Sequence, residues 1–221
     1  MEGGKAAGMT GGCCGHEAKF DGLSAAYKRA LWAVIAINGA MFLTETAAGI
    51  FAGSQALKAD ALDFLGDTAT YAITLFVIGM PLVWRARAAL LKGLTLGAMG
   101  LWVLASTAYN LFVLGVPRAE VMGAVGVVAL AANLTSVVLL LSYRNGDANV
   151  RSVWLCSRND AIGNVAVILA ASGVWASGTP WPDLIVAGIM ASIFLWSSAQ
   201  IARQAVGELT HVSAHRESAA E

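Results

Sequence analysis

Two segments of an otherwise apolar sequence carry metal-binding side chains at a helical spacing. Asp63 and Asp67 are four residues apart, which places both carboxylates on one helix face, about 6 Å from one another. Cys156 and Asp160 repeat the spacing in a later segment. If the two segments face each other, three carboxylates and one thiolate supply the four ligands of a tetrahedral Zn²⁺ site. The thiolate also suits softer ions such as Cd²⁺, and affinity alone does not choose among divalent metals.

Further polar residues accompany these pairs within the apolar segments. Asp60 lies one helical turn before Asp63, where it lines the entrance, carries a proton, or hydrogen-bonds a neighbouring helix. Glu45 is interpreted as an inner polar contact in preference to a proton relay, and Asn164 is placed to orient Asp160. Because ionisable side chains at membrane depth usually mark function, the set as a whole indicates a functional site.

The N-terminal segment holds a second group of soft ligands, Cys13, Cys14 and His16. They lie in a polar, glycine-rich stretch that we expect to be a flexible tail over residues 1–29. Such a tail either collects a metal ion and passes it on or carries incidental thiols, since this compact spacing alone does not close a tetrahedral site.

The composition indicates a membrane protein. Of the 221 residues, 57% are hydrophobic and 13% are charged, against about 25% charged residues in soluble domains. The mean hydropathy is +0.67. Disordered, collagen-like and disulfide-rich secreted proteins are excluded. With 14 basic and 14 acidic residues, no basic excess indicates binding to nucleic acid.

Six segments are long and apolar enough to cross a bilayer, which takes about 20 residues. The sequence therefore predicts an all-α membrane protein, a bundle of six transmembrane helices over residues 30–205, followed by a short C-terminal tail over 206–221. Gly and Pro end most segments, and Asp183 is placed to cap the last helix. The predicted spans are 31–52, 59–80, 88–115, 121–143, 152–176 and 183–205.

The distribution of basic residues predicts that both termini are cytoplasmic. Eleven Lys and Arg fall on the side that carries the termini and two, Lys58 and Arg118, fall on the other. Cytoplasmic loops carry this excess in membrane proteins. Arg158 is the one basic residue assigned to neither side; within the fifth predicted span it partly offsets the acids or extends to the interface.

Both metal-binding segments resemble those of the cation diffusion facilitator family. Residues 53–67 read GSQALKADALDFLGD, similar to that family's G-S-x-A-L-x-x-D-A lead before an [H/D]-x-x-x-D pair. Residues 149–164 read NVRSVWLCSRNDAIGN, similar to its N-x-R-x-x-x-L-[H/D]-x-x-x-D-A-x-G-S helix. The resemblance covers about residues 28–205, and six spans with both ends inside also match the family.

The resemblance implies a six-helix bundle, usually a homodimer, that exports Zn²⁺ and related divalent ions from the cytoplasm in exchange for protons. Carried over by position, the transport site is Asp63, Asp67, Cys156 and Asp160. Cys156 stands where the family has His or Asp, and Arg158 departs from its pattern. We expect a short form without the family's cytoplasmic C-terminal domain, in a bacterial inner membrane. Gly93 and Gly97 form a G-x-x-x-G that allows close helix approach, within one bundle or between two.

Two other kinds of protein remain as alternatives. A metal-dependent intramembrane enzyme needs an open coordination position and a nearby general base, but the sequence has no H-E-x-x-H and no His at membrane depth. A membrane protein that binds a metal without moving it is the second alternative. We therefore expect no enzyme activity, no catalytic residue and no cofactor other than the transported ion.

Overall fold

The structure is a computed structural model that describes residues 24–77, 82–113, 115–144 and 148–218. Within these ranges it contains α-helices, one short 3₁₀ helix and no strand. The proposed tail ligands Cys13, Cys14 and His16 lie outside the described residues. The helices are α1 (Ala25–Ala52), α2 (Gln55–Val77), α3 (Leu82–Asn110), α4 (Ala119–Leu140), η1 (Leu141–Tyr143), α5 (Ala148–Ser177) and α6 (Trp181–Ser218).

Local signals in the sequence explain several helix ends. The Ser24 side chain accepts a hydrogen bond from the Tyr27 N–H at 3.1 Å and caps α1. Gly53 follows α1 with φ 70° and Gly178 follows α5 with φ 62°, a left-handed conformation that glycine adopts without steric strain. The helix α6 continues to Ser218, past the predicted end of the last span at residue 205.

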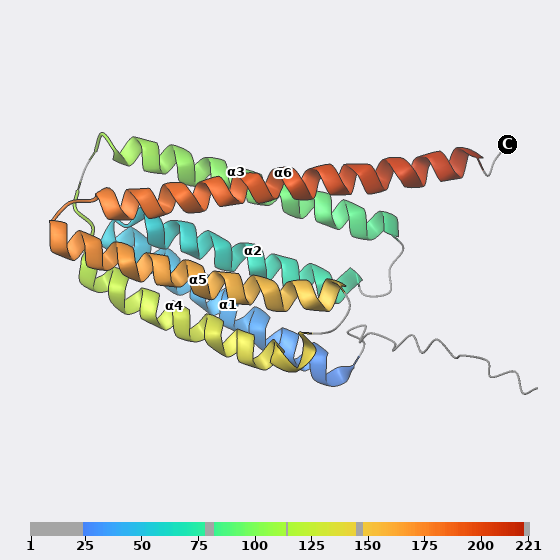
Figure 1. Ribbon diagram of the computed structural model, residues 1–221, viewed down its shortest axis with the longest axis horizontal. Coiled ribbons are helices and arrows are strands. Elements are labelled where there is room, and N and C mark those ends of the chain that lie inside the picture. Colours follow the sequence, from blue (N-terminus) through green and yellow to red (C-terminus); the bar gives the residue numbers. More distant parts are fainter. Residues whose placement is uncertain (1–23, 78–81, 114, 145–147, 219–221) are drawn as a thin grey trace, which may run out of the picture.

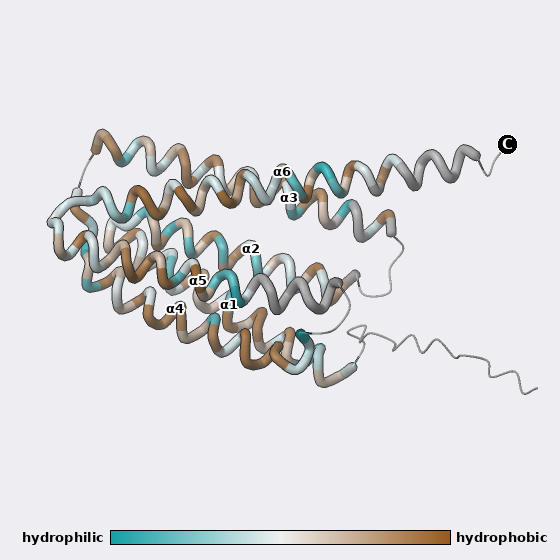
Figure 2. Tube along the Cα trace, in the orientation of Figure 1, coloured by the Kyte–Doolittle hydropathy of each residue, from teal (hydrophilic) through white to brown (hydrophobic). Residues whose placement is uncertain are grey.

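Within the described residues, five helical stretches are long and apolar enough to cross a membrane, and they begin at Ala25, Ala89, Ala119, Ser157 and Trp181. The remaining one, α2, carries Lys58, Asp60, Asp63 and Asp67. It packs against α1, α3, α5 and α6, so that protein rather than lipid surrounds its charges. The predicted all-α membrane bundle is confirmed, and Figure 2 shows hydrophilic positions within α2 and α5 near the middle of otherwise largely hydrophobic helices.

The helices form two units that lie side by side. Figure 1 shows α3 and α6 running along each other, apart from the unit formed by α1, α2, α4 and α5. The first described residues of α1 and the last of α6 lie at the same end of the bundle, as an even number of crossings requires. We call this the terminal end. The two units meet through α2 and α5, which carry the predicted ligands.

Close backbone contact joins α3 to α6. The Ser198 hydroxyl donates a 2.7 Å hydrogen bond to the Gly93 carbonyl, and a Cβ at Gly97 would lie 2.6 Å from the Ser198 Oγ. The G-x-x-x-G pattern of Gly93 and Gly97 therefore serves packing within this chain, one of the two uses that the sequence left open.

The half of the bundle away from the terminal end holds the largest group of buried apolar side chains. Residues from all six α-helices form its main apolar cluster, with Leu57, Val103, Met122 and Ala187 almost fully buried. Small side chains dominate the α2 and α5 contributions, which lets the helices approach closely. This cluster closes the far half of the interface between the two units.

A carboxylate ties the start of α2 to the start of α6. Asp183 accepts hydrogen bonds from the Ser54 hydroxyl at 2.6 Å and from the backbone N–H groups of Gln55 and Ala56 at 2.8 and 3.0 Å. The prediction that Asp183 caps α6 is wrong, because α6 already begins at Trp181. Asp183 instead satisfies the unpaired N–H groups of the first turn of α2.

Candidate functional site

A cavity of ≈ 710 Å³ lies between the two helix units. Four helices line it, α2, α3, α5 and α6, and most of the lining side chains are apolar. Its charged groups are Asp63 and Asp67 from α2, Lys92 from α3 and Asp160 from α5, while α6 contributes no charged side chain. Its apolar wall overlaps the apolar cluster of the far half, because Met190 and Phe194 belong to both.

Three of the four predicted ligands converge in this cavity. Asp63 and Asp67 lie one turn apart on α2, and the carboxyl group of Asp160 on α5 is within hydrogen-bonding reach of both. Asp67 is buried, and the other two are half-buried. The antiparallel packing of α2 on α5 thus brings the Asp160 carboxyl group close to those of Asp63 and Asp67. The three carboxyl groups share a largely apolar space.

The fourth predicted ligand, Cys156, belongs to α5 by its backbone, but its side chain lies outside the described residues. Among the side chains that are described, no three His, Cys, Asp or Glu form a group arranged to hold a metal ion. The carboxyl groups instead approach one another, because Asp160 can hydrogen-bond Asp63 and Asp67 directly. The four-residue metal site therefore stays a prediction.

A buried tyrosine supports the carboxylate pair, and the sequence analysis missed it. The Tyr71 hydroxyl donates a hydrogen bond to Asp67 and lies 3.3 Å from the Ser157 hydroxyl on α5. Tyr71 is fully buried. Its position four residues after Asp67 continues the spacing that begins at Asp63, and that spacing was the signal available in the sequence.

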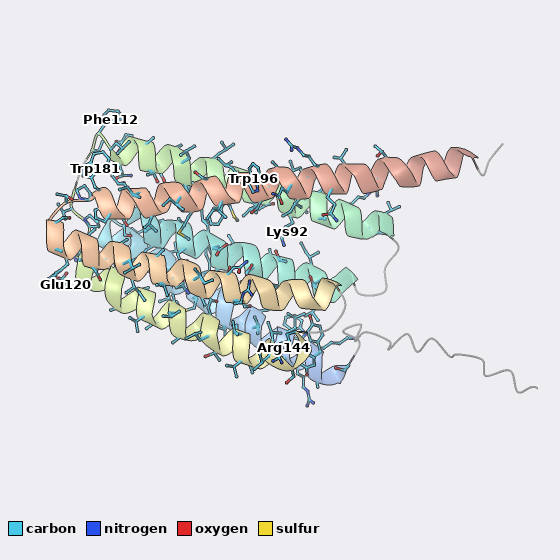
Figure 3. All side chains as sticks on the ribbon, viewed as in Figure 1. Lys92, Phe112, Glu120, Arg144, Trp181 and Trp196 are labelled. Carbon is cyan, nitrogen blue, oxygen red and sulfur yellow. The ribbon has the colours of Figure 1, made fainter. Side chains whose placement is uncertain are left out.

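Lys92 is the second residue of the site that sequence analysis misplaced, because it was counted with the cations outside the membrane. It lies inside the apolar part of α3, Ala89–Asn110, and lines the cavity. Figure 3 shows its side chain extending from α3 toward α2 and α5. Nothing in the local sequence distinguishes a lysine that turns inward from one that extends to the interface.

Glu45, Asp60 and Asn164 do not line the cavity. Each is nearly or fully buried, with exposed fractions of 0%, 2% and 0%. Glu45 lies close to Asp60. Among the residues that the structure describes, no hydrogen bond of normal geometry reaches the Glu45 carboxyl oxygens or the Asn164 amide atoms. Buried polar groups without partners are rare and costly, so the unit of α1, α2, α4 and α5 has a polar interior beside the cavity.

Arg158 is exposed and donates a hydrogen bond to the Asn159 side chain at 3.2 Å. Of the two roles predicted for Arg158, this exposure fits an outward-facing side chain better than an offset to the acids of the cavity.

Comparison with known proteins adds two findings. A family model described as the cation efflux transmembrane domain matches residues 85–210. The metal cation efflux system protein CzcD of Cupriavidus metallidurans and the cation efflux system protein CzcD of an Alcaligenes strain are each 29% identical over 186 residues, which cover 76% of this chain and 56% of the relative. The chain thus spans about half the length of these curated relatives.

Proposed function

The chain belongs to the cation efflux family, and we propose that it exports divalent transition-metal cations from the cytoplasm, with Zn²⁺ as the main substrate. The names of the two relatives support metal cation efflux. The proposed transport site is Asp63, Asp67 and Asp160 together with Cys156, a ligand set that suits Zn²⁺ and tolerates Cd²⁺ or Co²⁺.

The observation that carries this proposal is the meeting of three carboxyl groups from α2 and α5 in one cavity within the membrane part of the chain. Carboxylates placed this close repel one another, so they need either shared protons or a cation. A dication that binds oxygen and thiolate ligands meets the second need and displaces the protons as it binds.

Proton exchange follows from the same geometry. An empty, fully charged site would be costly to carry across hydrocarbon, and protonation of Asp63, Asp67 and Asp160 lowers that cost. In the proposed cycle the metal leaves the cytoplasm as protons leave the site, and protons return with the empty carrier. Glu45, Asp60 and Asn164 are the proposed proton path, because their unpartnered polar atoms beside the site favour internal water.

The shape of the bundle supports an assignment of direction. The charged groups of the cavity lie nearer the terminal end than the apolar cluster that includes Leu57 and Val103. With the termini in the cytoplasm, as the basic residues predict, we infer that the ion reaches these groups from the cytoplasm. Export then requires α3 and α6 to move against α2 and α5 so that the far half opens.

The proposal also covers the membrane in which the chain lies and its assembly. We place it in a bacterial inner membrane, with the family's homodimer as its expected assembly. An intramembrane enzyme and a metal-binding protein without transport are the alternative functions, and each predicts metal binding without metal flux.

Transport by proteoliposomes tests the function. We expect uptake of Zn²⁺ that depends on an imposed proton gradient and that alkalises the lumen in step with metal movement, because protons leave as the metal enters. Asp63→Ala and Asp160→Ala are expected to abolish uptake, because each leaves the ion with an incomplete set of ligands. Cys156→His is expected to keep uptake and to shift preference away from Cd²⁺.

The controls separate the alternatives. Arg203→Gln changes an exposed cation on α6 outside the cavity and should leave uptake unchanged. Metal uptake that neither responds to the gradient nor moves protons would refute proton exchange. Tight metal binding without any uptake would refute transport and favour the metal-binding alternatives.

A further inference from the structure

Lys92 brings a positive charge into the carboxylate cavity. It lines the same cavity as Asp63, Asp67 and Asp160, and its charge acts on both Asp63 and Asp67. In Figure 3 the side chain leaves α3 on the side that faces α2 and α5. Its neighbour Gly93 packs against α6, so the register of α3 on α6 fixes the direction in which Lys92 extends.

The inward direction of this lysine needs an explanation. A lysine near the end of a transmembrane span lowers its free energy by extending its ammonium group to the interface. Lys92 instead shares a largely apolar cavity with three carboxyl groups. Attraction to those groups offsets part of the cost of leaving water, and the described part of the chain places no other charged side chain on the cavity wall.

We propose that Lys92 is a resident counter-cation that sets the affinity of the site for its dication. The inference rests on the proposed function. When the site is empty, the ammonium group offsets the carboxylate charge. When a dication binds, the ammonium group repels it, so the metal binds more weakly than the carboxylates and thiolate alone would allow. A transport site needs this, because an ion that is bound too tightly is not released.

The proposal makes Lys92 a residue that tunes affinity rather than a ligand, since an ammonium group has no lone pair to donate to a metal. Removing the charge should therefore tighten metal binding, whereas removal of a ligand or of a structural contact would weaken it. This difference in sign separates the inference from an ordinary packing role.

The test measures Zn²⁺ and Cd²⁺ binding to the full chain in nanodiscs at fixed pH and ionic strength. Lys92→Met, which keeps most of the length of the side chain and removes the charge, should lower the dissociation constant about tenfold, equivalent to ~1.4 kcal/mol. Lys92→Arg keeps the charge and should stay within about twofold of wild type. Arg87→Met is the matched control, because Arg87 is an exposed cation on the same helix that stacks on Trp84 and does not line the cavity.

Chelator-induced metal release gives a second readout, and Lys92→Met should release the ion more slowly than wild type. Binding by Lys92→Met that equals or falls below wild type would overturn the inference, as would equal tightening by Lys92→Arg. If Arg87→Met also binds the metal more tightly, the tighter binding arises from the loss of any positive surface charge, and the inference about Lys92 is overturned. If wild type binds neither metal, the proposed function fails together with the inference, whereas wild-type binding that Lys92→Met leaves unchanged refutes the inference alone.

Discussion

Replacing Tyr71 by Phe removes from the carboxylate site a buried hydroxyl that donates a hydrogen bond to Asp67. The Tyr71 hydroxyl donates to Asp67 and lies beside Ser157. The side chain is fully buried, so water does not easily take the place of the lost hydroxyl. We expect Tyr71→Phe to fold as wild type does and to bind Zn²⁺ more weakly.

The magnitude follows from the charge of Asp67 in the two states. With metal bound, Asp67 is ionised, and a hydrogen bond to a charged group contributes about 1.5–3 kcal/mol. Without metal, we propose that the carboxyl groups share protons, and a hydrogen bond between neutral groups contributes about 0.5–1.5 kcal/mol. The difference of roughly 1–1.5 kcal/mol favours the metal-bound state, so its loss weakens binding about tenfold. Partners that orient metal ligands in other proteins have effects of about 10- to 100-fold.

The assay is a Zn²⁺ titration of the full chain in nanodiscs, with thermal unfolding measured on the same samples. Tyr109→Phe is the control, because Tyr109 on α3 is 65% exposed and does not line the cavity. Tyr71→Phe binding within twofold of wild type would refute the argument that Tyr71 orients Asp67. Weaker binding together with a large loss of thermal stability would assign the effect to folding instead.

Two further substitutions test how the helices are held. Asp183→Ala removes the acceptor shared by Ser54 and two backbone N–H groups of α2, and thermal unfolding should report a loss of about 2–3 kcal/mol; an unchanged melting temperature would contradict the role in capping α2. Gly173→Ala adds a Cβ 2.9 Å from the rigid ring of Pro182, so unfolding should show a loss of about 1–3 kcal/mol. Gly163→Ala is its control, since nothing lies within 4 Å of the added Cβ, and equal losses in both variants would refute the contact.

The four-residue spacing of Asp63 and Asp67 was informative because residues four apart in an α-helix point in nearly the same direction. Asp63 and Asp67 lie one turn apart on α2 in the structure, and Asp160 on α5 approaches both; their binding of a metal stays a prediction. The part played by Cys156 stays a prediction. Asp183 shows the limit of local reasoning, because a residue placed beside one helix start in sequence caps another helix that only the folded bundle brings near.

The amino-acid sequence by itself determined the membrane class, the helices and the spacing of the predicted metal ligands, since hydropathy and helical periodicity are properties of neighbouring residues. Only the tertiary structure decided which helices meet. The packing of α3 on α6 through Gly93 turned Lys92 inward, and the packing of α2 on α5 placed Tyr71 beside Ser157. Such contacts join residues that are far apart in the chain. Their geometry depends on how the side chains of two helices fit together, which cannot be worked out from either helix alone.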